Sequence, residues 1–267
     1  IVKIHTVILA AGEGSRMLSS KAKSLQPVGG YSMLRRIYET VKDITNKTTF
    51  VVGYEKDSII KESESFDGNI NISEQKQAIG TADAVRSSLD TISADSKVLV
   101  LYGDVPLIKK NTLENLISMT DTGLTILTTQ INDPTGYGRV KKDKDGMAQA
   151  IVEERDASMD EKLIKEIFTG ILCCNKSLLE EAINEVENNN AAKEYYLTDI
   201  VSIINSKGFK INTCLVSSEE VQGANTKTEL AELEEIYRKM KAEDLLQLGA
   251  TLSDPSRVDI RGKVSVG

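Results

Sequence analysis

The chain has 267 residues, of which 40% are hydrophobic and 27% are charged, and its formal net charge is −7. This composition is ordinary for a globular protein, and the negative charge disfavours broad binding to nucleic acid, which depends on clustered Lys and Arg. No apolar run approaches the roughly 20 residues of a membrane span, and the first residues do not resemble a secretory signal, so we expect a cytoplasmic protein that works away from membranes.

In the first hundred residues, apolar, β-branched runs alternate with amphipathic stretches. Strands are predicted over 6–9, 49–52 and 98–101, and helices over 32–44, 56–65 and 81–89. This alternation is typical of βαβ units and a mainly parallel sheet. Ligands of such sheets bind beyond the carboxyl ends of the strands. We therefore expect the functional site in the loops that follow Leu9 and Leu101.

The second half begins with shorter elements and ends with a long helix. Strands are predicted over 124–131, 138–142, 149–152 and 169–174, and capped helices over 177–186 and 198–204. We expect these strands to form the opposite wall of a cleft. Apolar residues recur at helical spacing from Thr226 to Leu248, and Gly249 is placed to end that helix. Beyond it, residues 258–266 alternate between apolar and polar, which predicts strands at the start of something longer.

A glycine-rich turn follows the first predicted strand and reads Leu9, Ala10, Ala11, Gly12, Glu13, Gly14, Ser15, Arg16, Met17. Small residues let backbone amides approach a phosphate, and Arg16 adds a charged donor. Met17 stands where a Rossmann fingerprint has its third glycine, and no Gly-Lys-Ser/Thr ending marks a Walker loop. On glycine spacing alone, an ordinary strand-to-helix turn is an equally good interpretation.

Two further motifs carry polar groups at predicted strand ends. Gln75 precedes Gly80 and Thr81, and an amide side chain with nearby backbone groups can pair with the edge of a uracil base. Tyr102, Gly103 and Asp104 follow an apolar strand, so a carboxylate that suits a hard cation such as Mg²⁺ lies at the edge of the sheet. Taken singly, each motif is also consistent with a polar turn.

Together, and in this order, these strings resemble the bacterial bifunctional N-acetylglucosamine-1-phosphate uridylyltransferase and glucosamine-1-phosphate acetyltransferase family. The resemblance extends over nearly the whole chain. It continues through Lys23 and through four later strings, which are DPTGYGR at 133–139, IVE at 151–153, TGIL at 169–172 and EYYLTDI at 194–200.

The resemblance implies an α/β fold with a Rossmann-like nucleotidyltransferase domain, of the nucleotide-diphospho-sugar transferase type, over residues 1–226. Its sheet would be mixed and mainly parallel. A linker helix would follow over 227–249, and 250–267 would begin a left-handed β-helix acetyltransferase domain. The full-length protein would be a homotrimer that also acetylates glucosamine 1-phosphate, with acetyl-transfer residues that lie outside this sequence.

The implied reaction joins UTP and N-acetylglucosamine 1-phosphate into UDP-N-acetylglucosamine and pyrophosphate, with Mg²⁺, for peptidoglycan and lipopolysaccharide precursors of the cell wall. Arg16 and Lys23 would be catalytic, and Asp104 and Asn225 would hold the metal. The implied substrate-binding residues are Leu9, Ala10, Ala11, Gly12, Lys23, Gln75, Gly80, Thr81, Tyr102, Gly103, Asp104, Gly138, Glu153 and Asn225.

The chain departs from the family pattern at four positions. Ala22 stands where proline usually precedes the lysine, Glu13 replaces a common lysine, Ala78 replaces a glutamine, and Phe168 replaces an asparagine that binds the sugar. A phenyl ring cannot supply the hydrogen bonds of an amide. Two alternatives therefore stay open, a related enzyme for another sugar or base and a non-catalytic nucleotide-sugar sensor.

The other conspicuous residues are interpreted as structural. His5 is the only histidine and has no partner motif, so no catalytic triad is expected. Cys173 and Cys174 would point to opposite faces of one strand, which excludes a paired metal site and leaves reduced core thiols. Glu180, Glu181 and the charged residues from Glu229 to Asp244 are interpreted as solvated helix surfaces.

Overall fold

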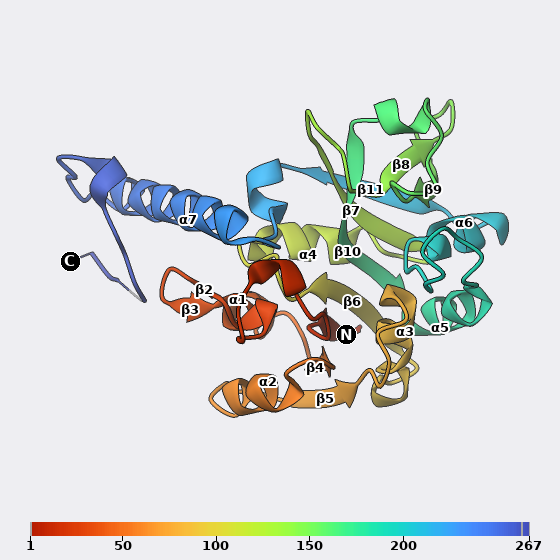
Figure 1. Ribbon diagram of the computed structural model, residues 1–267, viewed down its shortest axis with the longest axis horizontal. Helices are drawn as coiled ribbons and strands as arrows, with labels where there is room; N and C mark the ends of the chain where they lie inside the picture. Colours follow the sequence, from red (N-terminus) through yellow and green to blue (C-terminus); the bar gives the residue numbers. More distant parts are fainter. Residues whose placement is uncertain (1, 263, 267) are drawn as a thin grey trace.

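The computed structural model describes residues 2–262 and 264–266, in which helices cover both faces of one large sheet (Figure 1). The strands of this sheet are β1 (Lys3–Leu9), β4 (Lys47–Val52), β5 (Ile70–Glu74), β6 (Ser96–Tyr102), β7 (Leu124–Gln130), β8 (Arg139–Lys142), β9 (Ala148–Val152), β10 (Glu166–Asn175) and β11 (Ile211–Val216). The helices are α1 (Met33–Val41), α2 (Lys56–Ser63), α3 (Thr81–Arg86), α4 (Lys110–Ser118), α5 (Lys176–Glu185), α6 (Asp199–Ser206) and α7 (Lys227–Gln247). The expected strands and helices over residues 6–248 are confirmed, with ends shifted by a few residues.

The sheet has the order β11-β7-β10-β6-β1-β4-β5, and the β8–β9 hairpin joins it through β10. Strands β6, β1, β4 and β5 pair in parallel, as do β7 and β11, whereas β10 runs antiparallel to β6 and β7. The carboxyl ends of β1, β5 and β6 therefore meet at one edge. The expected mixed, mainly parallel α/β sheet is confirmed.

Side chains that alternate along the strands build a core on each face of the sheet. Val7 and Leu9 pack with α3, α5 and α6 in one cluster, whereas Ile8 and Ala10 pack with α1, α2 and α4 in the other. The same alternation sends Cys174 into the first cluster and Cys173 into the second, as predicted. All three cysteines are free and buried. His5 is 3% exposed, and its Nε2 lies 2.7 Å from Thr49 Oγ1, so it is part of the core.

Helix α7 begins where it was expected. The Thr226 side chain accepts a hydrogen bond from the amide of Glu229, and Gly249 follows the helix with a φ of +92°. One side of α7 packs on Met17, on Met33 and on the small hairpin of β2 (Pro27–Val28) and β3 (Tyr31–Ser32). The rest of the helix projects away from the sheet (Figure 1). Within the described residues, no helix combines the length and the apolar character needed to cross a membrane.

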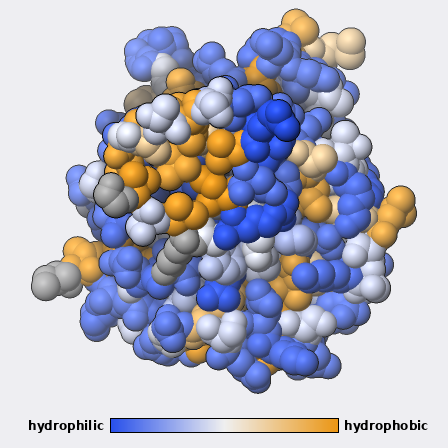
Figure 2. Space-filling view, turned by 90° about the vertical axis from the view of Figure 1, so that its left-hand side faces the viewer, coloured by the Kyte–Doolittle hydropathy of each residue, from blue (hydrophilic) through white to orange (hydrophobic). Residues whose placement is uncertain are grey.

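The strands predicted beyond the long helix are wrong for the described part of residues 250–266, which contains no strand. Alternating apolar residues form a strand only when a neighbouring strand accepts their backbone hydrogen bonds, and the part of the chain that the structure describes places no strand beside them. Figure 2 shows a hydrophobic cluster on the face that carries the end of α7. The exposed apolar side chains at the end of α7 and in the residues after it include Leu246, Leu248, Val264 and Val266. The β-helix assignment of residues 250–267 and the domain boundaries stay predictions.

Candidate functional site

A cavity of about 330 Å³ lies at the carboxyl edge of the parallel strands. It is lined by predicted site residues that follow β1, β5 and β6 or begin α3, together with Lys23. These residues are Leu9, Ala10, Ala11, Gly12, Lys23, Gln75, Gly80, Thr81, Tyr102, Gly103 and Asp104. The edge of the sheet is therefore where the structure gathers most of the predicted residues.

The loop after β1 lines this cavity with Ala11 and Gly12 and carries backbone donors that are not used elsewhere in the described residues. Gly103 donates a hydrogen bond to the carbonyl of Leu9 at 2.8 Å, which joins the ends of β1 and β6. A Cβ at Gly103 would lie 3.0 Å from that carbonyl oxygen, so a larger residue would have to displace the carbonyl slightly. The amides of residues 11–14 donate no hydrogen bond within the described residues. Unpaired amides in a concave loop suit an anion such as phosphate.

Lys23, Asp104 and Asn225 converge at the border of the cavity. The Lys23 ammonium lies 2.5 Å from Asp104 Oδ2 and 3.0 Å from Asn225 Oδ1, although Asn225 is 202 residues away in the sequence. The side chains of Lys23 and Asp104 are 21% and 14% exposed, so solvent screens their ion pair only in part. The structure thus brings these three predicted residues together.

Glu229 does not belong to the solvated surface expected for the start of the long helix. Its carboxylate accepts a hydrogen bond from the backbone amide of Asn225 at 2.6 Å. Glu229 also lines a second cavity. Glu229 is the third residue of α7, where an acidic side chain reaches back to the free amides before the helix. It therefore orients the loop that carries Asn225.

The second cavity, of about 540 Å³, adjoins the first and shares Tyr102 and Asp104 with it. Its opposite wall is formed by the β8–β10 segment, as expected, and it includes the predicted residues Gly138, Glu153 and Asn225. A Cβ at Gly138 would lie 2.7 Å from the side chain of Ile151, so the close contact between these two residues requires glycine at position 138.

Glu153 lines the second cavity and has the acidic neighbours Asp156 and Asp199 on its other side. Burial raises the pKa of its carboxyl group, against a hydrogen bond from Thr198 Oγ1 at 2.9 Å. The Thr198 side chain was expected to cap α6 but pairs with Glu153 instead. Burial, then the charges of Glu153 and Asp156, raise the pKa of Asp199 to about 6. Of these three carboxylates, Glu153 alone lines the second cavity, where it can accept hydrogen bonds from hydroxyl groups of a ligand.

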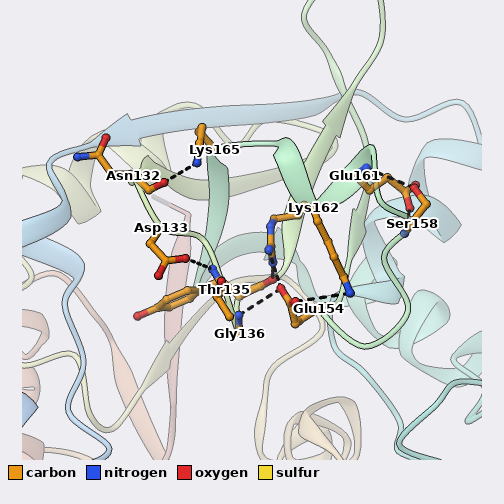
Figure 3. A network of polar contacts seen from close by, with 11 residues as sticks. Asn132, Asp133, Thr135, Gly136, Glu154, Ser158, Glu161, Lys162 and Lys165 are labelled. Carbon is orange, nitrogen blue, oxygen red and sulfur yellow. Dashed lines mark hydrogen bonds and ion pairs between the residues drawn. The ribbon is translucent and has the colours of Figure 1, made fainter.

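The loop of residues 133–139 is ordered by the contacts in Figure 3. Asp133 accepts a hydrogen bond from the Thr135 amide, and Glu154 accepts one from the Gly136 amide at 3.2 Å. Glu154 also pairs with Arg139, which is 1% exposed, at 2.5 Å. These contacts hold the loop that brings Gly136 to Gly138 into the cavity wall.

Arg16 is not brought to either cavity. It lies on the short turn Ser15–Met17, in which Met17 is buried against α7 and Arg16 is exposed. A buried anchor at Met17 directs the neighbouring side chain outward. Arg16 forms no hydrogen bond or ion pair within the described residues, and its catalytic role stays a prediction.

Several residues of the site went unrecognised in the sequence. Gly170 has a φ of +86°, and a Cβ there would lie 2.3 Å from the ring of Tyr102, which lines both cavities. Ser24 lines the first cavity with a buried hydroxyl that has no hydrogen-bond partner among the described residues. Phe168, noted only as a departure, is 6% exposed and lines the second cavity. The Thr-Gly string around Gly170 was the only available signal for the first of these.

Comparisons with known proteins identify the family of this chain. Residues 6–166 match the family described as MobA-like NTP transferase domain. The chain is 40% identical over 267 residues to the bifunctional protein GlmU of Marinobacter nauticus, and 42% identical over 268 residues to that of Francisella philomiragia. These alignments cover 99% and 100% of the chain but only 58% and 59% of the two relatives.

A solved structure supports the fold alone. A putative glucose-1-phosphate thymidylyltransferase from Bacillus anthracis superimposes with a TM-score of 0.70 and 18% identity, covering 95% of this chain and 98% of that one. The nucleotidyltransferase fold expected from the sequence is therefore confirmed. The family match, the full-length similarity to the N-terminal part of GlmU proteins and the cavities at the sheet edge lead to one conclusion: this chain belongs to the MobA-like NTP transferase domain family.

Proposed function

We propose that this chain transfers the uridylyl group of UTP to N-acetylglucosamine 1-phosphate, which yields UDP-N-acetylglucosamine and pyrophosphate. The observation that carries the proposal is the convergence of Lys23, Asp104 and Asn225 where the two cavities meet. The similarity of this whole chain to 58–59% of the length of proteins named bifunctional GlmU supports the same reaction. The nucleotide would occupy the first cavity and the sugar the second, so that their phosphates meet beside Tyr102 and Asp104.

The reaction needs no general base in the protein. A phosphate oxygen of the sugar 1-phosphate is already ionised and attacks the α-phosphorus of UTP, while the bond from that phosphorus to the bridging oxygen breaks and pyrophosphate leaves with its electron pair. Positioning and charge neutralisation then supply the catalysis. Lys23 would neutralise negative charge on the phosphates, and the free amides of residues 11–14 would bind the triphosphate.

The donor set fits a magnesium ion. Asp104 Oδ2 and Asn225 Oδ1 are both within hydrogen-bond distance of the Lys23 nitrogen, so two hard oxygen ligands face one position. A magnesium ion there would take the place of the Lys23 ammonium, which would turn to the phosphates. Magnesium usually takes few protein oxygens and completes its shell with phosphates and water. When bound, it would neutralise phosphate charge and align the phosphates of the two substrates. No cluster of three or more His, Cys, Asp or Glu side chains competes for a metal within the described residues.

The wider biological role is part of the same proposal. The chain spans about 58% of the relatives it matches, so acetyl transfer and trimer formation would belong to a longer protein. By the resemblance, the reaction would take place in the cytoplasm and feed peptidoglycan and lipopolysaccharide precursors.

Phe168 favours a second candidate function. Phe168 lines the second cavity, which is the one proposed for the sugar. The family resemblance implies an asparagine at this position. A buried phenyl ring offers apolar contact and no hydrogen bond. The alternative is a uridylyltransferase with the same chemistry that accepts a sugar 1-phosphate lacking the N-acetyl group, such as glucose 1-phosphate.

One assay separates these functions. Pyrophosphate release is measured with Mg²⁺ for each combination of UTP, dTTP and CTP with N-acetylglucosamine, glucosamine and glucose 1-phosphates. The highest kcat/KM for UTP with N-acetylglucosamine 1-phosphate supports the proposal, and the highest value for glucose 1-phosphate supports the alternative. Binding of UDP-N-acetylglucosamine without turnover of any pair would instead indicate a non-catalytic sensor.

A further inference from the structure

The side-chain amide of Gln75 has one orientation in the first cavity. Its Nε2 donates to the carbonyl oxygen of Gly80 at 3.0 Å and to Asp83 Oδ2 at 3.1 Å. A backbone carbonyl and a carboxylate only accept hydrogen bonds, so neither can face the amide oxygen favourably. The two partners use both hydrogens of the amide nitrogen. The assignment of nitrogen and oxygen on Gln75 therefore follows from its partners.

This orientation leaves Gln75 Oε1 as the polar atom available to a ligand. Gln75 is 9% exposed and lines the cavity. Its Oε1 accepts no hydrogen bond within the described residues. It is also not among the polar side-chain atoms that are buried from solvent and lack a partner. The amide oxygen of Gln75 is therefore exposed, and Gln75 lines the first cavity. It presents an acceptor there and no donor.

A backbone donor accompanies this acceptor. The Gly80 amide donates no hydrogen bond within the described residues. Gly80 has a φ of +130°, and a Cβ there would lie 2.3 Å from the carbonyl oxygen of Tyr195, so the backbone must approach closely at this point. Uracil and thymine carry an N3–H donor flanked by two carbonyl acceptors. Cytosine instead has an acceptor at N3, which an amide oxygen would repel.

Asp83 lies behind Gln75 and does not line either of the two cavities. Its other oxygen, Oδ1, is 3.5 Å from Arg86 Nη1. Arg86 is itself anchored, because its Nη2 donates to the carbonyl of Ile183 at 2.8 Å and its guanidinium lies 5.3 Å from the centre of the Tyr195 ring. Arg86 therefore holds Asp83, and Asp83 holds the amide nitrogen of Gln75.

We propose that Asp83 is a positioning residue that fixes the Gln75 amide and thereby selects a base with a donor at N3, uracil or thymine, over cytosine. The inference rests on the proposed nucleotidylyl transfer in this cavity. Asp83 acts through Gln75 and touches neither substrate nor metal.

The test compares kcat/KM for UTP and CTP in Asp83→Asn. The side chain of asparagine can donate as well as accept, so at residue 83 it would no longer require the Gln75 amide nitrogen to face it. The carbonyl of Gly80 would still require this orientation. We expect the UTP-to-CTP ratio to fall about 10-fold, mostly through a higher KM for UTP, since an unpaired buried polar group typically costs a factor of this size. Asp83→Ala should lower the ratio in the same direction.

Asp90→Asn is the matched control, because Asp90 is exposed and lies in the short turn Leu89–Thr91 that follows α3. It should leave the ratio unchanged. A double-variant comparison separates positioning from folding. Gln75→Leu should abolish most of the selectivity, and adding Asp83→Asn to it should change the ratio no further. A purely structural role of Asp83 would instead weaken UTP and CTP equally in both backgrounds.

An unchanged UTP-to-CTP ratio in both Asp83 variants, with UTP turnover intact in the unsubstituted chain, would overturn the inference alone. A selectivity loss from Asp83→Asn that persists in the Gln75→Leu background would also overturn it. Failure of the unsubstituted chain to bind or use any pyrimidine nucleoside triphosphate would overturn the proposed function and this inference with it.

Discussion

Gly170→Ala is expected to destabilise the protein and to deform the site, because two separate constraints meet at this residue. Its φ of +86° is unfavourable for alanine, at a cost of about 1–2 kcal/mol. The added Cβ would also lie 2.3 Å from two atoms of the Tyr102 ring, which must then move. Overpacking of this kind costs about 1–3 kcal/mol. The sum is about 2–5 kcal/mol.

Gly208→Ala provides a control with the same backbone constraint and no clash. Gly208 has a φ of +83°, and a Cβ there would have no neighbour within 4 Å. Its expected cost is therefore the backbone part alone, about 1–2 kcal/mol. For a chain of this size, 1 kcal/mol shifts Tm by about 2–4 °C. We expect Tm to fall by roughly 4–20 °C in Gly170→Ala and by roughly 2–8 °C in Gly208→Ala.

Thermal unfolding by circular dichroism and pyrophosphate release measure the two effects. Only Gly170→Ala should also lower kcat/KM, because Tyr102 lines both cavities and Gly208 lines neither. Equal losses of Tm in the two variants, with equal activity, would refute the reasoning that the ring of Tyr102 depends on the absence of a side chain at residue 170.

Three further predictions concern the metal ligand, the buried histidine and the sugar cavity. Asp104→Ala should lower kcat by about 100-fold or more while UTP still binds, and near-normal pyrophosphate release with Mg²⁺ would contradict the metal assignment. Burial first, and the charge of Lys47 second, lower the pKa of His5 to about 4. The stability that neutral His5 contributes is fully present above about pH 6.5 and is lost as pH falls toward 4, by about 3 kcal/mol. Urea unfolding at pH 7 and at pH 4 should show that the free energy of unfolding falls less in His5→Gln than in the unsubstituted chain. Phe168→Asn should raise kcat/KM for N-acetylglucosamine 1-phosphate relative to glucose 1-phosphate, at a stability cost of about 3–5 kcal/mol for the lost ring, and an unchanged ratio in the substrate assay would exclude Phe168 from sugar selection.

Local patterns were sufficient to predict most of the fold. The βαβ alternation of the first hundred residues, the strands from residue 124 to 174 and the long helix ended by Gly249 all follow from hydrophobic periodicity and helix-ending chemistry, and the structure has them. The opposite faces of Cys173 and Cys174 follow from the period of two along a strand. The glycine-rich turn and the Tyr102-Gly103-Asp104 string were found because parallel strands place their carboxyl ends at one edge.

Other properties were decided by the tertiary structure. Glu229 turned inward to the Asn225 amide, Thr198 turned to Glu153 instead of capping its helix, and the buried neighbour of Arg16 sent that side chain away from the cavities. In the described residues after 250, the apolar alternation produced no strand, because no neighbouring strand lies beside it there. Periodicity records which face of an element is buried, because burial depends on neighbours a few residues away. The distance from Lys23 to Asn225, 202 residues apart, depends on how whole elements pack, and only the folded chain sets it.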